Sequence, residues 1–233
     1  MNTRTDPARP PIRRYEQYCP VARSLDVLGE RWTLLIVRNL LMGPQRYTDL
    51  REGLPGIATD LLTARLRTLE EAGYVQRRKL PRPAPATVYE LTGSGRRAGR
   101  VVLELARLGI ERLGPPAADE DIRPGAVVLS LRASLNPAAA GDARASYQLE
   151  LDGEPFTISA GDGQVETARG QAAAPLFTLT TSARTLAELL SDATDPAAAI
   201  GAGALQTDAA PAALERFLNT FAYPAPHRQP VKP

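Results

Sequence analysis

Residues 56–73 have the sequence GIATDLLTARLRTLEEAG, and this stretch decides the fold of the front half of the 233-residue chain. At about 100° per residue, Leu62, Leu66 and Leu69 form one apolar stripe, with Ala58 beside them. The opposite face is short, polar and cationic, and it consists of Asp60, Thr63, Ala64 and Arg67. Such a face suits a helix that enters a groove, although a solvated helix face also has this character.

A second, shorter helix is predicted within residues 45–55, directly before this stretch. Thr48 is expected to cap it, and Asp49 suits the positive end of its dipole. The run from Gly53 to Gly56 then forces a tight turn. Two helices joined by so short a turn predict a helix-turn-helix, whose second helix reads the major groove of DNA.

A β-hairpin is predicted directly after the second helix. Residues 74–78 and 87–91 have strand patterns, and they bracket a basic, proline-rich loop at residues 79–86. Two helices followed by a hairpin with a basic tip form a winged helix, so the sequence predicts this fold for the front half. Upstream, helices are expected at residues 21–28 and 32–42, with Trp32 as a packing residue.

Residues 19–113 resemble the HxlR family of bacterial winged-helix regulators, which is related to MarR-type proteins. The resemblance depends on the motifs CPVA (19–22), LGERWTLLI (28–36), GPQRY (43–47), LPGI (54–57), LTARL (62–66), LEEAG (69–73) and YELT (89–92). It implies a homodimer that binds a roughly palindromic operator in double-stranded DNA. Asp60 departs from the family, which often has a basic or neutral residue there. A carboxylate repels phosphate unless it accepts a hydrogen bond from a cytosine amino group.

The predicted DNA contacts fall into two kinds. Thr59 is expected to reach phosphate, whereas Thr63, Ala64 and Arg67 are expected to reach base edges, with Arg67 reading guanine. Lys79 and Arg82 of the wing are placed over phosphates or in the minor groove. The full predicted set is Arg46, Thr48, Thr59, Thr63, Ala64, Arg65, Arg67, Arg78, Lys79 and Arg82.

The distribution of charge supports a division into two domains. The first 116 residues contain 20 Lys and Arg against 12 Asp and Glu, a net charge of +8. The remaining residues contain 8 against 14, a net charge of −6. We expect a winged-helix domain at 14–114, a Pro-containing linker at 115–121 and a second domain at 122–223. Attraction of phosphate is thereby assigned to the front half.

The second half has alternating strand patterns followed by helices. Strands are expected at 126–132, 145–151, 155–160, 164–168 and 176–180, with a short one at 204–207, and helices at 183–190, after Asp195-Pro196 and at 211–221. Asp152-Gly153 and Asp162-Gly163 predict hairpin turns.

This half resembles the sterol-carrier-protein-type lipid-binding domain over residues 120–223. The resemblance depends on LFTLTTSARTLAELL (176–190), on DPAAAIGAGALQT (195–207) and on the Phe-bearing last helix. It implies an α/β domain with a five-stranded sheet and an apolar tunnel for a lipid, acyl or polycyclic ligand. The proposed ligand residues are Leu129, Leu149, Phe156, Ile158, Phe177, Phe217 and Phe221. The alternative is that these side chains pack on one another and leave no cavity.

Catalysis is not expected, and no cofactor or metal is expected either. The single His and the single Cys, His227 and Cys19, provide neither a catalytic triad nor a set of metal ligands. Gly93-Ser94-Gly95 is interpreted as the entry to a helix and not as a phosphate loop. Without a long apolar run or a signal peptide at its start, the chain is expected in the cytoplasm and not in a membrane.

Three alternatives stay open at this point. Cys19 either senses oxidants or electrophiles, as in some HxlR members, or is a half-buried residue before Pro20 without redox use. The amphipathic helix predicted at residues 95–113 either pairs with the N-terminal segment across a dimer or is buried on its own domain. The whole chain is either a repressor with a ligand-sensing second domain or a lipid carrier whose winged helix only docks.

Overall fold

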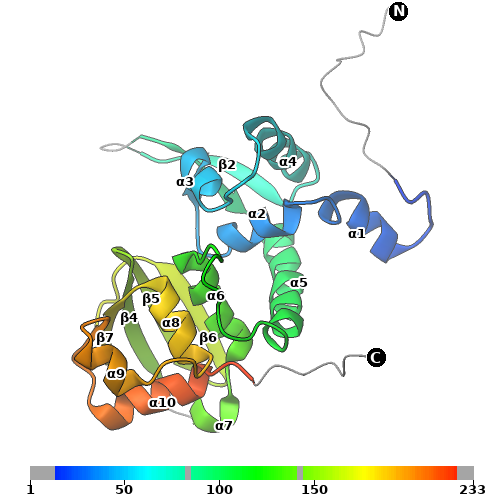
Figure 1. The fold of residues 1–233 in the computed structure, drawn as a ribbon. Helices are drawn as coiled ribbons and strands as arrows, with labels where there is room; N and C mark the ends of the chain where they lie inside the picture. Colours follow the sequence, from blue (N-terminus) through cyan, green and yellow to red (C-terminus); the bar gives the residue numbers. More distant parts are fainter. Residues whose placement is uncertain (1–13, 82–84, 141–143, 225–233) are drawn as a thin grey trace, which may run out of the picture. The chain divides into compact units, whose positions relative to one another are not determined.

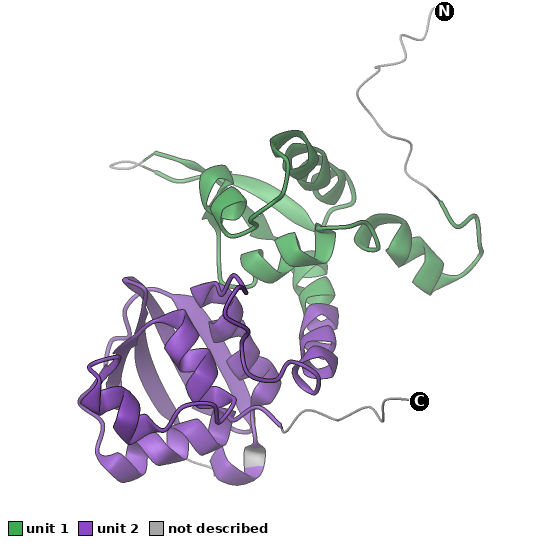
Figure 2. Cartoon of the chain, in the orientation of Figure 1, with its two compact units in different colours: residues 1–99 green, residues 100–233 purple. Residues whose placement is uncertain are grey.

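The structure is a computed structural model that describes residues 14–81, 85–140 and 144–224. Its chain divides into two units, residues 1–99 and residues 100–233, which are coloured separately in Figure 2. Figure 1 labels the helices and strands of both units. The predicted α+β class is confirmed, with a winged helix in the first unit and a five-stranded sheet in the second.

The first unit combines helices with a small antiparallel sheet. Its helices are α1 (Pro20–Leu28), α2 (Thr33–Leu40), α3 (Tyr47–Glu52), α4 (Thr59–Glu71) and the beginning of α5 (Gly93–Ile110). Its strands, in the spatial order β1-β3-β2, are β1 (Gln45–Arg46), β2 (Val75–Lys79) and β3 (Thr87–Leu91). β2 and β3 pair from Val75–Leu91 to Lys79–Thr87, so the predicted hairpin is confirmed.

The apolar stripe of α4 faces the core of the first unit, as predicted. Leu62, Leu66 and Leu69 are fully buried. Ala58 does not join them, because it lies before the first turn of the helix and is exposed. Ile57 is buried instead. The backbone at Ala58 is extended, so the side chains of Ile57 and Ala58 point in opposite directions.

α3 begins one residue before Thr48, which was predicted to cap it. The helix begins at Tyr47, so Thr48 lies inside its first turn and does not cap it. Asp49 takes the capping role, since its Oδ2 accepts the backbone N–H of Arg46 at 3.0 Å. This carboxylate also lies at the positive end of the helix dipole, as the sequence predicted.

The second unit is a mixed sheet with helices. Its strands, in the spatial order β6-β5-β4-β7-β8, are β4 (Ala145–Leu151), β5 (Glu154–Gly161), β6 (Gln164–Arg169), β7 (Thr178–Thr181) and β8 (Leu205–Thr207). β4 and β7 run parallel, and the other neighbouring pairs are antiparallel. Its helices after α5 are α6 (Pro124–Ser134), α7 (Pro137–Ala140), α8 (Ala183–Leu190), α9 (Pro196–Gly201) and α10 (Pro211–Phe221).

The two predicted hairpin turns of this sheet are confirmed. Asp152 and Asp162 have φ angles of 52°, and the glycines that follow them have φ angles of 80° and 68°. Two consecutive left-handed residues are what a two-residue turn needs to match the twist of its strands. These Asp-Gly pairs therefore fix the register of β4 with β5 and of β5 with β6.

The prediction of a strand at residues 126–132 is wrong, because this segment belongs to the helix α6. Pro124 occupies the first turn of that helix, where its fixed φ angle and missing N–H are tolerated. Adjacent apolar residues in this segment, Val127, Val128 and Leu129, are all buried. A short apolar run buried on several sides has no clear period, so its β-branched residues favoured the wrong element. The sheet keeps five strands because β8 joins it.

A cluster of aromatic rings fills part of the core between the sheet and α10. Tyr147 lies 4.9 Å from Phe177 and 5.0 Å from Phe217, measured between ring centroids. Phe217 in turn lies 4.9 Å from Phe221. Edge-to-face contacts of this kind add to the stabilisation that burial alone provides.

In the described part of the chain, no helix is long and apolar enough to cross a membrane.

Candidate nucleic-acid interface

The recognition helix α4 is placed by a rigid turn that follows α3. Gly56 adopts a φ angle of +84°, which a residue with a side chain rarely takes. The guanidinium of Arg38, on α2, donates to the carbonyl of Gly53 at 3.3 Å and to Oδ1 of Asn39 at 3.0 and 3.1 Å. Burial lowers the pKa of Arg38. The hydrogen bond from Arg38 to the Gly53 carbonyl connects α2 to the turn and so positions the start of α4.

Tyr47, the first residue of α3, contacts the exposed side of α4 and was not among the residues predicted from the sequence. Its hydroxyl donates to the carbonyl of Thr59 at 2.9 Å and lies 3.2 Å from Oγ1 of Thr63. The hydroxyl of Thr63 also donates to the Thr59 carbonyl, at 3.0 Å. Both hydroxyl protons therefore point at the protein backbone, and each must turn away before it can donate to a phosphate or a base. The place of Tyr47 in the GPQRY segment, at the start of the preceding helix, was the available signal.

The outward face of α4 carries Asp60, Ala64, Arg67 and Glu71. Arg67 is two-thirds exposed, with 66% of its side chain accessible, and its Nε lies 2.9 Å from a carboxylate oxygen of Glu71. An exposed pair of this spacing stabilises a helix by about 0.3–0.5 kcal/mol, so opening it costs little. The guanidinium of Arg67 can therefore exchange Glu71 for another acceptor at little cost.

Arg65 differs from the other predicted DNA contacts. Only 15% of its side chain is exposed, its Nη2 lies 2.6 Å from Glu30, and its Nε donates to the carbonyl of Arg31 at 3.2 Å. These partners belong to the segment between α1 and α2. Arg65 therefore ties the recognition helix to the N-terminal part of the unit.

The wing carries cations that are partly neutralised. Arg78 pairs with Glu90 across the hairpin at 2.8 Å, and hydrogen bonds first from Arg78 and then from Gln76 hold the pKa of Glu90 below its usual range. Arg77 pairs with Glu70 of α4, also at 2.8 Å. Lys79 and Arg46 are exposed, and no described acidic residue pairs with either of them. Arg82 lies outside the described residues.

The remaining predicted threonines are exposed. Thr48 lies on α3, where its hydroxyl donates to Asp49 at 3.2 Å. Thr59 begins α4, next to the positive end of the helix dipole. With Thr63, Ala64 and Arg67, Thr59 belongs to one accessible side of the first three turns of the helix. The structure thus brings the α4 residues of the predicted set together, apart from Arg65.

Cys19 is a free, half-buried thiol that immediately precedes α1. Its side chain does not cap the helix, and its backbone carbonyl accepts the N–H of Arg23 at 3.0 Å. A redox role for this residue stays a prediction.

The residues predicted to bind a ligand lie in the interior of the second unit. Leu129 is on α6, Leu149, Phe156 and Ile158 are on the sheet, and Phe177 precedes β7, while Phe217 and Phe221 are on α10. Each has at most 3% of its surface exposed. A cavity of about 960 Å³ is lined by other residues, on the side of α10 that meets α8 and α9.

Comparison with known proteins places this chain among transcriptional regulators. The family profile described as HxlR-like helix-turn-helix matches residues 27–116. The HTH-type transcriptional regulator sll1512 of Synechocystis sp. is 37% identical over 95 residues, which cover 41% of this chain and 70% of the relative. The chain belongs to the HxlR family. A second relative, the HTH-type transcriptional regulator YvaP of Bacillus subtilis, is 32% identical over 104 residues, which cover 44% of this chain and 96% of the relative.

Solved structures of transcriptional regulators also match part of the chain. The reduced form of the transcriptional regulator YodB from B. subtilis has a TM-score of 0.37 and 31% identity, over 43% of this chain and 100% of that one. The redox regulator HypR in its oxidised form has a TM-score of 0.37 and 34% identity, over 39% and 94%. All predicted DNA contacts, from Arg46 to Arg82, lie inside the segment that matches the HxlR profile, whereas Cys19 precedes it.

Proposed function

We propose that this HxlR-family protein is a transcriptional repressor that binds operator DNA as a homodimer in the cytoplasm. The observation that carries the proposal is the exposed side of α4, which follows a rigid helix-turn and is flanked by a hairpin wing. A helix presented in this way enters the major groove, and a dimer places two such helices about 34–36 Å apart. Thr63, Ala64 and Arg67 then meet base edges, while Arg46, Thr59 and Lys79 meet phosphates.

The charge of the front half supports binding to nucleic acid. The net charge of +8 over the first 116 residues attracts phosphate, even though some arginines of the interface are paired in the free protein. Binding through several phosphates releases counterions and therefore depends steeply on salt.

The test of this function is a titration of the full chain with labelled duplex DNA at increasing salt. We expect the affinity to fall about 10³-fold between about 50 and 200 mM salt, as for a protein that neutralises about six phosphates. Fluorescence anisotropy with a duplex from the promoter region of its own gene, and with a random duplex as control, provides the measurement. Affinity that does not change with salt, or absence of binding to either duplex, contradicts the proposal and favours a lipid carrier with a docking winged helix.

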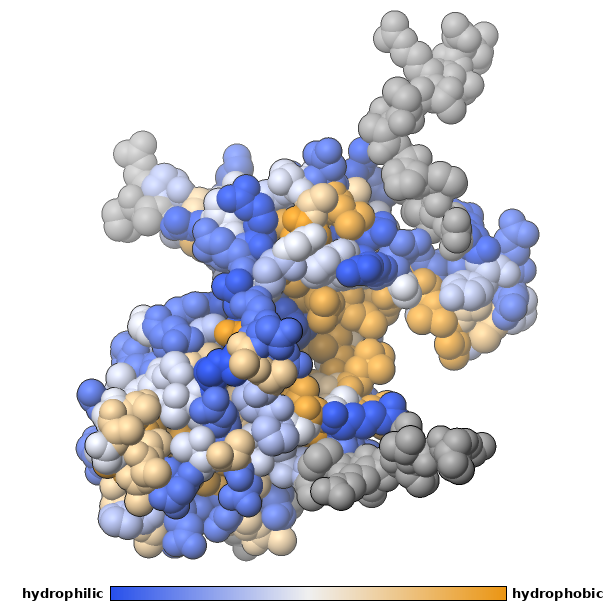
Figure 3. Space-filling model, viewed as in Figure 1, coloured by the Kyte–Doolittle hydropathy of each residue, from blue (hydrophilic) through white to orange (hydrophobic). Residues whose placement is uncertain are grey.

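Dimerisation is supported by apolar side chains that the described chain leaves in solvent (Figure 3). On and before α1 these are Tyr15, Tyr18, Val21 and Leu25, and on and after α5 they are Val101, Leu105, Leu108 and Leu113. Val101, Leu105 and Leu108 follow one another at helical spacing, so they form one stripe. Val102 and Ile110 of the same helix are buried, so α5 has a buried side and an exposed apolar side.

Substitution of Leu108, which is 62% exposed, by glutamate is expected to weaken the dimer. A carboxylate on this stripe has to lose its hydration when the stripe is covered, so we expect the dimer dissociation constant to rise about tenfold or more. Sedimentation velocity over a range of concentrations measures the change. Leu176→Glu is the matched control, because Leu176 is 64% exposed and belongs to neither α1 nor α5 but to the segment before β7. Equal effects of both substitutions would remove α5 from the proposed interface.

We further propose that the second unit is a sterol-carrier-like module that receives a small-molecule signal and thereby alters DNA binding. Its support is the five-stranded sheet that the resemblance implied, and a cavity of the size that small ligands occupy. A ligand changes the affinity for DNA only if it binds one arrangement of the dimer better than another.

A further inference from the structure

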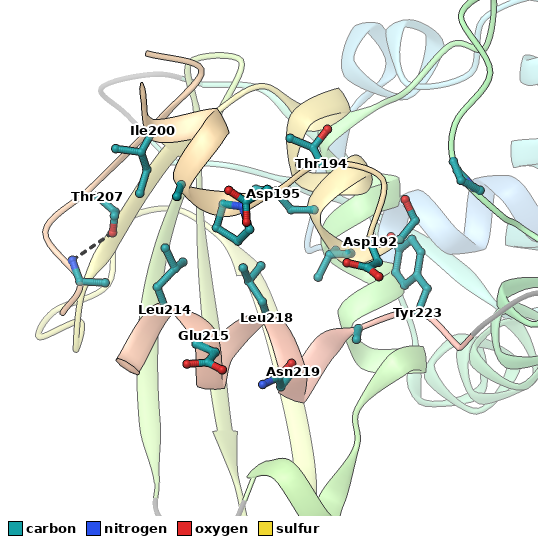
Figure 4. Close-up of a pocket in the computed structure, with 18 of the residues that line it drawn as sticks. Asp192, Thr194, Asp195, Ile200, Thr207, Leu214, Glu215, Leu218, Asn219 and Tyr223 are labelled. Atoms are coloured by element: carbon teal, nitrogen blue, oxygen red, sulfur yellow. Dashed lines mark hydrogen bonds between the residues drawn. The ribbon is translucent and has the colours of Figure 1, made fainter. Parts of the chain in front are cut away.

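The cavity of the second unit lies among three helices and the segment that follows α5. Its volume is about 960 Å³, within the range of about 300–1,000 Å³ that drug-sized ligands use. The C-terminal end of α8, the loop from α8 into α9, and α10 surround it, and Gly114 and Pro115 complete it. Figure 4 shows Leu214 and Leu218 pointing from α10 into this space.

The inner surface of the cavity is apolar. Leu189 and Leu190 from α8 and Leu214 and Leu218 from α10 are all at most 9% exposed, so their side chains form a fixed floor. Ile200 of α9, by contrast, is 46% exposed and lies at the edge. An apolar body of a ligand gains free energy here by leaving water.

The charge around this floor has one sign. Asp192, Asp195 and Glu215 are exposed at the cavity, and its described lining contains no Lys, Arg or His. One oxygen of Asp195 accepts the N–H of Ala198 at 2.8 Å, but no described cation pairs with any of the three carboxylates. Within the described residues, their negative charge therefore has no cationic partner.

Helix ends of both signs border the cavity. The C-terminal ends of α8 and α10 line it, and so do Pro196 and Pro211, which begin α9 and α10. The partial charges of these helix ends oppose one another, so the negative charge at the cavity comes from its carboxylates. The ring of Tyr223 also lines the cavity, and its hydroxyl lies 2.6 Å from that of Ser130. Aromatic faces attract cations.

We propose that this cavity binds a lipophilic organic cation, with its apolar body on the leucine floor and its positive charge among Asp192, Asp195 and Glu215. The inference rests on the proposed function as a ligand-sensing regulator and names the chemical class of the signal. An anionic acyl chain does not fit this charge.

The position of the cavity places a ligand next to the segment that follows α5. Gly114 and Pro115 of that segment touch the cavity directly. Arg184, in the first turn of α8, donates to the carbonyls of Ala117 and Glu120 at 3.1 and 2.9 Å. α8 thus contacts this segment through its N-terminal end and lines the cavity with its C-terminal end.

Two probe ions of nearly equal shape and opposite charge test the proposal. The full chain is titrated in a calorimeter with tetraphenylphosphonium and, separately, with tetraphenylborate. We expect the cation to bind at least about tenfold more tightly than the anion. Neutralising two carboxylates, in Asp192→Asn/Glu215→Gln, is expected to weaken binding of the cation about tenfold, since two charge pairs with the ligand are lost. Glu166→Gln, an exposed carboxylate of β6 away from the cavity, is the control for net charge.

A second pair of variants tests the location. Ala197 and Ala198 are both exposed on α9, but only Ala197 lines the cavity. Ala197→Trp is expected to abolish binding of the cation, whereas Ala198→Trp is expected to leave it unchanged. Equal binding of both ions, or no effect of the double neutralisation, would overturn the proposal. The result is independent of DNA binding: a chain that binds the cation but no duplex contradicts the proposed function and leaves the cavity assignment intact.

Discussion

Replacing Gly95 with alanine is expected to lower the free energy of unfolding of the first unit by about 3 kcal/mol. Gly95 lies in the first turn of α5, where its backbone passes against the end of the wing. A Cβ atom there would overlap the carbonyl oxygen of Tyr74 and lie 3.1 Å from Cβ and Cδ2 of Leu91. The Tyr74 carbonyl cannot move away freely, because it accepts the N–H of Thr92 at 3.0 Å. The gain in helix propensity, about 1 kcal/mol, offsets only part of this cost.

Urea-induced unfolding followed by fluorescence measures this change. The single tryptophan, Trp32, belongs to the first unit, so its emission reports on that unit. Gly93→Ala is the matched control, because a Cβ atom at Gly93 meets nothing within 4 Å. The control is expected to be neutral or slightly stabilising. If both alanine variants unfold at the same urea concentration, the close approach of Gly95 to Tyr74 does not exist in solution.

Replacing Arg67 with alanine is expected to weaken operator binding by about 1–3 kcal/mol and to weaken binding of random duplex much less. Arg67 is the exposed cation of the outward face of α4, and its present partner Glu71 is itself exposed, so the ion pair opens at little cost. In the complex the guanidinium exchanges this carboxylate for the two acceptors of a guanine.

Anisotropy titrations of both duplexes at one fixed salt concentration provide the measurement. Arg144→Ala is the control, since Arg144 is also an exposed arginine paired with a carboxylate, Asp162, but belongs to the second unit. It removes the same charge and is expected to change neither affinity by more than about twofold. An equal loss of affinity for both duplexes on substitution of Arg67 would assign this residue to phosphate contact.

The parts of the fold that follow from local rules were predictable from the sequence. The spacing of Leu62, Leu66 and Leu69 predicted the buried side of α4, and the Asp-Gly pairs predicted both hairpin turns of the second unit. α6 was not predictable in this way, because Val127 and Val128 favour strands while burial on several sides removes the helical period.

The site residues were less predictable, since tertiary contacts decide their roles. Arg65 has the composition and position of a DNA contact, but it pairs with Glu30, which is 35 residues earlier in the chain. The cavity depends on Pro115, Leu189 and Leu214, which come from distant parts of the sequence. No local sequence pattern identifies residues that meet only in the folded structure. The resemblance to a lipid carrier predicted ligand residues in the aromatic core instead.

The arginine–carboxylate pairs of the winged helix have a consequence for the proposed DNA binding. Arg67, Arg77 and Arg78 are each paired with a carboxylate in the free protein, so a single phosphate contact gains little free energy by replacing that partner. A bidentate contact to guanine, as proposed for Arg67, gains more. We therefore expect these acidic neighbours to lower the affinity for random duplex more than the affinity for the operator.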